Sequence, residues 1–198
     1  MKIAEAAKVK SFEVVIGYGE LGGVDSKLLE HGSFKFKHIP MKRGGINPIE
    51  DIKTFIYLWK FFKNEKPDIV HLVTIKPYLY GGIISRLIGV PALVSAVSGL
   101  GTIFIGKNLK IKFLRILLFY FYKLAFNHFN QKVIFQNKDD LDVLVNWGVL
   151  SHHKTSLIKG SGVQIENFTN LDEPKGIPTI CFAARLLRDK GVYEFVSA

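Results

Sequence analysis

Short apolar runs alternate with amphipathic segments along the chain, and the stretch from Lys66 to Val97 shows this most clearly. Ile69–Thr74 is an apolar run rich in β-branched residues, and Ala92–Val97 is a second such run. Between them, Tyr78–Ile88 carries apolar residues at helical spacing and ends at Gly89. Apolar strands separated by a helix are typical of a parallel sheet covered on both sides. The pattern therefore predicts an α/β fold with a parallel sheet and helices on both faces.

The same alternation of apolar strands and amphipathic helices is predicted for the rest of the chain. We expect further strands at Phe12–Ile16, Phe34–Ile39, Lys132–Gln136, Lys154–Ile158 and Thr179–Ala183, and further helices at Met1–Lys10, Ile49–Lys63, Lys107–Asn130, Leu141–Trp147 and Val192–Ala198. Ligands of open parallel sheets collect beyond the carboxyl ends of the strands. The expected ligand-facing loops are therefore Thr74–Tyr78 and Ser98–Thr102, although either loop could merely connect two elements.

A polar segment with two prolines, Glu166–Pro178, is the best linker candidate. It predicts a main domain over residues 1–168, a linker over 169–178 and the beginning of a second domain over 179–198. A strand with a few helical residues cannot bury a core of its own. A parallel-sheet domain also rarely begins with a short helix that leads straight into a strand. We therefore expect the chain to be incomplete at both ends, with a first strand possibly missing.

Charge and composition narrow the classes of partner. The chain has 198 residues, a net charge of +10, 48% hydrophobic residues and 22% charged residues, which indicates a globular protein with an anionic partner. Nucleic acid is not expected, because there is no basic stripe interleaved with exposed aromatics and no zinc-finger or homeodomain signature. Cys181 stands alone, which favours a reducing compartment. The N-terminus has no uninterrupted apolar core of signal-peptide type.

The predicted helix Lys107–Asn130 is heavily apolar and aromatic and is punctuated by lysines and one arginine. Its uncharged part is shorter than the roughly 20 apolar residues that a bilayer requires. It can be a buried core helix. It can also be an interfacial helix, with lysines near lipid headgroups and aromatic rings in the acyl boundary.

Gly17–Gly22 matches G-x-G-x-x-G, the dinucleotide-binding fingerprint. The fingerprint requires a substantial helix after the last glycine, whereas Val24–Glu30 offers barely two turns. It also requires an acidic residue at the end of the next strand, where Lys37 and His38 stand instead. We interpret the glycines as a flexible turn and keep a dinucleotide-dependent oxidoreductase as an alternative.

No metal site is expected from the clustered acids and histidines. Asp139 and Asp140 lie just ahead of the predicted helix Leu141–Trp147, where helix capping and the helix dipole favour negative charge. His152 and His153 are adjacent and lack partners at metal-ligand spacing, so exposure on the surface is the simpler interpretation.

Two cations stand five positions apart near the end of the chain. Arg185 follows a predicted strand and Lys190 precedes a predicted helix, a placement that suits a diphosphate. The surrounding FAARLLRDKGVYEFVSA resembles the signature that opens the donor-nucleotide domain of GT-B glycosyltransferases of family 4. The resemblance implies that Arg185 and Lys190 hold the pyrophosphate of a nucleotide-sugar and stabilise it as it leaves.

Upstream segments carry the resemblance over nearly the whole chain. PDIVHLVTIKPYLYGGIISRLIGVP is similar to the family's central strand–helix unit, and KGSGVQIENF to the segment that closes its acceptor domain. SGLGTIF and VIFQNKDD resemble a subgroup that adds sugars to lipid-diphosphate-linked acceptors in bacterial capsule, O-antigen or glycan synthesis. The resemblance implies two Rossmann-like domains. On the acceptor side it makes His71 a weak catalytic candidate and offers Lys76, Gly99 and Gly101 as binding candidates.

The expected function is therefore hexosyl or N-acetylhexosaminyl transfer (EC 2.4) from a nucleotide-sugar to a lipid-linked saccharide. The expected donor is a UDP-sugar. The resemblance implies retention of the anomeric configuration without a cofactor or metal. It also implies peripheral attachment to the anionic inner face of the cytoplasmic membrane. The glutamates of the family's donor domain would lie beyond Ala198, so we expect this chain alone to be inactive. A second alternative is a non-catalytic basic module that binds a membrane surface.

Overall fold

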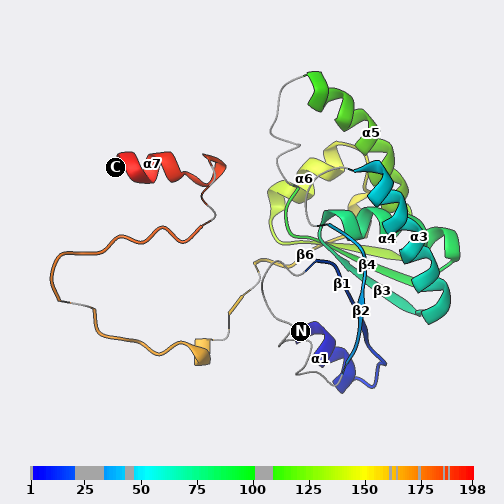
Figure 1. The fold of residues 1–198 in the computed structure, drawn as a ribbon, viewed down its shortest axis with the longest axis horizontal. Coiled ribbons are helices and arrows are strands. Elements are labelled where there is room, and N and C mark those ends of the chain that lie inside the picture. The colour runs from blue at the N-terminus through cyan, green and yellow to red at the C-terminus, as the bar shows by residue number, and fades with distance from the viewer. Residues whose placement is uncertain are drawn as a thin grey trace. The chain divides into compact units, whose positions relative to one another are not determined.

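The computed structural model describes residues 2–20, 34–42, 47–100, 109–160, 162–163, 165–173, 175–184, 186 and 188–198. The chain divides into two compact units, Met1–Ser161 and Gly162–Ala198. Figure 1 shows the helices and strands of each unit.

The first unit is an α/β structure, which confirms the predicted fold class. Its elements are α1 (Lys2–Val9), β1 (Val15–Tyr18), β2 (Lys35–His38), α3 (Pro48–Glu65), β3 (Ile69–Val73), α4 (Ile75–Ile88), β4 (Ala92–Val97), α5 (Leu109–Ala125), β5 (Gln131–Phe135), α6 (Lys138–Asn146), the 3₁₀ turn η2 (His152–Lys154) and β6 (Thr155–Leu157). β1 and β2 pair in parallel, and β3, β4, β5 and β6 form a four-stranded parallel sheet in that order.

The strand register decides which side chains share a face of the larger sheet. Leu72 lies beside Ser95, which lies beside Val133, and all three are buried. His71 and Val94 are neighbours on the opposite face, where His71 is exposed and Val94 is partly buried. β3 thus alternates between buried and exposed positions, whereas the sequence pattern predicted burial on both sides.

Helix α4 packs on β3 and β4 and also contacts α3 and α5, so the three helices lie side by side (Figure 1). The hydroxyl groups of Tyr78 and Tyr122 are 3.0 Å apart in the buried contact between α4 and α5. Gly82 allows the two helices to approach closely, because a Cβ atom there would lie 2.8 Å from the carbonyl oxygen of Ala125. This contact fixes α4 against the rest of the core.

Capping explains where two of the helices begin. Asn47 precedes α3, and its side chain accepts hydrogen bonds from the N–H groups of Ile49 and Glu50. Asn137 precedes α6 and accepts a hydrogen bond from the N–H group of Asp140 at 2.7 Å. The predicted helix start is confirmed, but α6 begins at Lys138 rather than Leu141, so Asn137 is the cap and Asp139 and Asp140 lie in the first turn, where the helix dipole favours negative charge.

Several element boundaries differ from the predictions. α4 begins at Ile75, so Thr74–Tyr78 is not a loop but the first turn of a helix. α5 ends at Ala125 rather than Asn130, because the next residues turn toward β5. β1 extends to Tyr18, which places Gly17 inside a strand and not in the loop that a dinucleotide fingerprint requires.

The described residues of the second unit form two 3₁₀ turns, η3 (Ile165–Asn167) and η4 (Arg188–Lys190), and one short helix, α7 (Val192–Ser197). The predicted strand Thr179–Ala183 is wrong, since these residues are irregular and Ile180 is 80% exposed. A single short apolar strand gains no ladder hydrogen bonds without a neighbouring strand in its own unit. The predicted helix at the end of the chain is confirmed.

Candidate acceptor-side site

The carboxyl end of β3 and the first turn of α4 meet at Thr74. Thr74 has a φ of 73°, a backbone conformation that β-branched residues rarely adopt, and its N–H donates to the carbonyl oxygen of Ala96 at 3.4 Å. Such a conformation costs about 1–3 kcal/mol and is concentrated at functional sites. It turns the chain directly from strand into helix, so that the amino end of α4 lies at the carboxyl end of β3, the edge where open parallel sheets commonly bind ligands.

Lys76 lies in this first turn of α4. Its ammonium group donates to an Asp51 oxygen at 2.9 Å, and the two side chains are only 19% and 17% exposed. A cation is unfavourable at a helix N-terminus, because the helix dipole is positive there. Asp51 offsets that repulsion. Binding of an anionic ligand therefore explains a lysine at this position better than helix stability does.

Asp51 is itself held in place by the start of α3. Its second carboxylate oxygen accepts a hydrogen bond from the N–H group of Asn47 at 3.2 Å. Burial, together with the charge of Asp51, raises the pKa of Tyr80 on the next turn of α4. The carboxylate therefore has a backbone donor, a lysine and a tyrosine around it, which fixes the position of Lys76.

The loop after β4 carries the second pair of predicted residues. Gly99 has a φ of 152°, which a residue with a side chain would adopt only under strain, and a Cβ atom there would meet nothing within 4 Å. Leu100 is buried and anchors the loop. Gly101 lies outside the described residues. Lys76 and Gly99 thus belong to adjacent strand ends, as the topology predicts.

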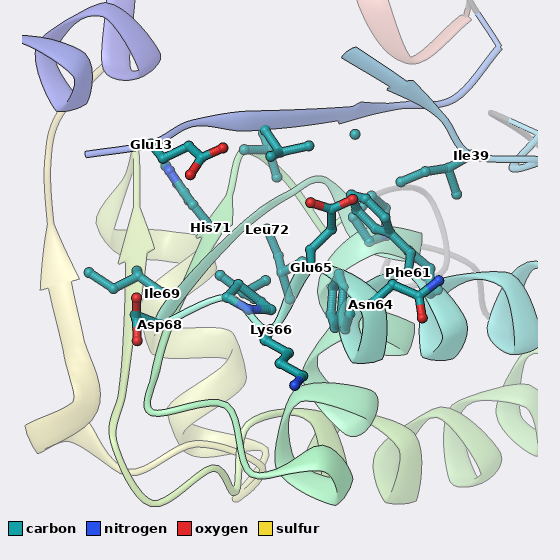
Figure 2. A pocket seen from close by; sticks show the side chains of 18 of the residues that line it. Glu13, Ile39, Phe61, Asn64, Glu65, Lys66, Asp68, Ile69, His71 and Leu72 are labelled. Atoms are coloured by element: carbon teal, nitrogen blue, oxygen red, sulfur yellow. The ribbon is translucent and has the colours of Figure 1, made fainter. Parts of the chain in front are cut away.

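His71, the weak catalytic candidate, lies elsewhere. It is the middle residue of β3 and lines a cavity between β3 and β1, where Figure 2 shows it beneath the ribbon of β1 near Glu13. Partial desolvation in this cavity lowers the pKa of His71. The structure does not bring it to the strand end where Lys76 lies.

The donor-side candidates lie in the second unit. Lys190 ends the 3₁₀ turn η4 and is exposed. Arg185 lies outside the described residues, so its pairing with Lys190 around a diphosphate stays a prediction.

Sequence reasoning missed Asp51 and Tyr80. Asp51 is 25 residues from Lys76 in the sequence, and its position in the first turn of a helix is explained by the helix dipole alone. Only the contact between α3 and α4 shows that it holds Lys76. Within the described part of the chain, no group of three or more His, Cys, Asp or Glu side chains could hold a metal ion. None of the described helices is long and apolar enough to cross a membrane.

Comparison with known proteins decides the family. A family model described as glycosyl transferase 4-like matches residues 1–137. The chain belongs to the glycosyl transferase 4-like family. This confirms the resemblance to family-4 glycosyltransferases that the sequence motifs indicated.

The glycosyl transferase 4-like chain is also similar to a curated protein. It is 30% identical over 130 residues to UDP-Gal:alpha-D-GlcNAc-diphosphoundecaprenol alpha-1,3-galactosyltransferase from Escherichia coli. That match covers 66% of this chain and 32% of the relative, so the chain spans about a third of the relative's length. Among solved structures, the crystal structure of Acinetobacter baumannii MurG matches 84% of this chain and 42% of its own, with 13% identity and a TM-score of 0.46.

Proposed function

We propose that the whole protein transfers a sugar from a UDP-sugar to a saccharide carried on a lipid diphosphate, and that this chain supplies the acceptor side. The observation that carries the proposal is Lys76, a cation fixed by Asp51 at the amino end of α4 in a chain of this family. The similarity to the E. coli galactosyltransferase supports it, because that enzyme is named for UDP-Gal as donor and an acceptor linked to diphosphoundecaprenol.

The Lys76 ammonium group and the backbone N–H groups of Ile75 and Lys76, the first two residues of α4, would bind the diphosphate of the acceptor lipid. Gly99, which presents backbone without a side chain, would let the first saccharide of the acceptor approach the sheet edge. An acceptor hydroxyl would then form a bond to C1 of the donor sugar while the bond from C1 to UDP breaks. The hydroxyl proton would pass to the diphosphate oxygen that leaves C1, and Arg185 and Lys190 would stabilise the remaining negative charge of the departing UDP. These cations would serve in place of a metal or cofactor.

The acceptor's lipid implies a membrane surface, and α5 offers a matching face. Ile116, Leu117, Tyr120 and Leu124 are exposed on it although they are large and apolar. The chain's net charge of +10 favours the anionic inner face of the cytoplasmic membrane. Peripheral binding there would bring the acceptor edge to lipid-linked substrate on the side where nucleotide-sugars are made.

Binding of an acceptor analogue tests the proposal directly. We expect the chain to bind a short-chain lipid-diphospho-GlcNAc in bicelles, measured by intrinsic tryptophan fluorescence, and Lys76→Met to weaken binding at least tenfold. Lys53→Met removes an exposed lysine from α3 and is the matched control, which should bind as the native chain does. Equal affinity of the two variants would refute the role of Lys76. With UDP-galactose added, we expect no turnover by this chain alone.

A further inference from the structure

An open cavity of about 590 Å³ lies between α5 and α6, the helices that follow β4 and β5 (Figure 1). Most of its lining comes from α6 and the residue that follows this helix, and α5 supplies the rest. The lining residues are Asp139, Asp142, Val143, Asn146, Trp147 and, from α5, Arg115. The acceptor-side site uses none of them.

The spacing of three polar residues places them in one row along α6. Asp139, Asp142 and Asn146 are three and four residues apart, so they share one face of the helix. At the helical rise per residue, the row extends about 10 Å. This is close to the length of two linked pyranose rings, so the row can bind hydroxyl groups of two neighbouring sugars.

The polar side chains of this row are available to a ligand. Within the described part of the chain, the side chains of Asp139, Asp142 and Asn146 make no hydrogen bond or ion pair. Carboxylates accept hydrogen bonds, an amide both donates and accepts them, and the guanidinium group of Arg115 adds donors from the other helix. Because a hydroxyl group also donates and accepts, a ligand rich in hydroxyl groups matches this lining.

Trp147 adds an aromatic surface of fixed position. Its backbone N–H donates to the carbonyl oxygen of Val143 at 2.9 Å, where α6 ends. Its indole meets the rings of Phe119 and Tyr122 edge to face, with ring centroids 5.7 Å and 5.6 Å apart. These contacts hold the indole against α5, so a ligand that stacks on it loses little side-chain entropy. The apolar C–H face of a sugar ring packs on an aromatic ring of this kind.

We propose that this cavity is a saccharide-binding groove, distinct from the acceptor-side site, that holds two sugar units of a neutral glycan. Trp147 would stack on the face of one sugar ring, while Asp142 and Asn146 would bind hydroxyl groups. The lining carries both signs of charge, because Arg115 lines it together with two aspartates, so it favours a neutral ligand. A glycan also fits the chain's family, whose members are glycosyltransferases.

Saccharide binding in this groove goes beyond the proposed function, because it requires neither a lipid diphosphate nor Lys76. Asp139 lies in the first turn of α6, just past the carboxyl end of β5. The groove therefore begins at the same edge of the sheet as the acceptor-side site. A glycan held here would keep a saccharide chain close to that site.

Tryptophan fluorescence tests the groove, because the chain has two tryptophans, Trp59 and Trp147. Trp59→Phe in the full chain leaves Trp147 as the only one. We expect its emission to change saturably with at least one of three neutral trisaccharides, built from glucose, galactose or N-acetylglucosamine, with a Kd below about 10 mM. Added salt should leave this binding unchanged, since a neutral ligand has no charge to screen. No saturable change with any of the three would overturn the proposal.

Substitutions in the same Trp59→Phe background locate the bound saccharide. Asp142→Ala combined with Asn146→Ala should weaken trisaccharide binding at least tenfold. Asn170→Ala combined with Asp172→Ala removes the same two kinds of side chain from exposed positions of the second unit and is the matched control. Equal affinity of these two double variants would overturn the proposal.

Lys76→Met separates the groove from the acceptor-side site. We expect this variant to bind the trisaccharide as tightly as the Trp59→Phe chain does, even if it no longer binds the lipid-diphosphate acceptor. Failure of the proposed function would thus leave trisaccharide binding intact. Loss of trisaccharide binding in Lys76→Met would place the saccharide in the acceptor-side site and overturn the assignment of a separate groove.

Discussion

The ammonium group of Lys76 lies 2.9 Å from a carboxylate oxygen of Asp51, and this pair joins the first turn of α4 to the first turn of α3. Both side chains are more than four-fifths shielded from solvent, unlike the exposed pair of Lys42 with Glu50 eight residues apart. The shielded pair holds a cation at the carboxyl end of β3, where the acceptor-side site is proposed. Its contributions to stability and to binding can be measured separately.

Asp51→Asn removes the charge that balances Lys76 while keeping the size of the side chain. We expect the free energy of unfolding to fall by about 1.5–3 kcal/mol, the usual contribution of a hydrogen bond to a charged group. Urea denaturation measures the change. Glu50→Gln breaks the exposed pair with Lys42 and should cost about 0–1 kcal/mol. If the two variants lose the same stability, the Asp51 pair is no more than a surface contact.

Gly82→Ala tests the close approach of α4 to α5. The new Cβ would lie 2.8 Å from the backbone carbonyl oxygen of Ala125, which cannot move without shifting a helix. We expect a loss of about 1–3 kcal/mol in the free energy of unfolding, typical of overpacking. At Gly81 the same substitution meets the flexible end of Leu72, at 2.7 Å. Gly81→Ala should therefore cost less, and thermal or urea unfolding of both variants decides the order.

Most strands and helices of the first unit could be predicted because each has a local signal. The apolar runs of β3 and β4 and the asparagine cap of α3 depend on residues close together in the sequence. Thr179–Ala183 has the same kind of apolar run and forms no strand. A strand depends on a neighbour that pairs with it, and composition alone does not supply that neighbour.

The candidate site was predictable only in part. The positions of Lys76 and Gly99 follow from the rule that ligands bind at the carboxyl ends of parallel strands. The partner of Lys76 did not follow, because Asp51 approaches it only through the packing of α3 on α4. The sequence also did not show that, among the described residues, β3 pairs only with β4, since an apolar strand has the same sequence whether one or both of its edges are paired.

The titration of His71 predicts a pH dependence of stability. Desolvation lowers its pKa in the folded protein from the usual value of 6.5. As the pH falls below about 6.5, the unfolded chain takes up the proton first, so the free energy of unfolding decreases. His71→Gln removes this contribution, and the difference in stability between the native chain and the variant should therefore change between pH 8 and pH 5.

Glu13, Glu65, Lys66 and Asp68 line the same cavity and are present in both proteins, so the comparison at each pH isolates the effect of His71. Urea denaturation at several pH values provides the comparison. The exposed residue His153 supplies the control, as His153→Gln. A stability difference for His71→Gln that does not vary with pH would contradict the role of desolvation.

The exposed apolar face of α5 predicts binding to anionic vesicles. Leu117 and Leu124 lie seven residues apart on this face with Tyr120, which is 60% exposed, between them. Inserting each leucine into the acyl boundary would contribute about 1.5–3 kcal/mol. Leu117→Asp combined with Leu124→Asp should therefore lower the partition coefficient on phosphatidylglycerol vesicles at least tenfold in a sedimentation assay.

Leu87→Asp combined with Ile56→Asp changes two exposed apolar residues on α4 and α3 and should leave partitioning nearly unchanged. Added salt should weaken binding of the native chain, because screening reduces its attraction to the anionic headgroups. If both double variants partition equally, α5 is not the face that meets the membrane.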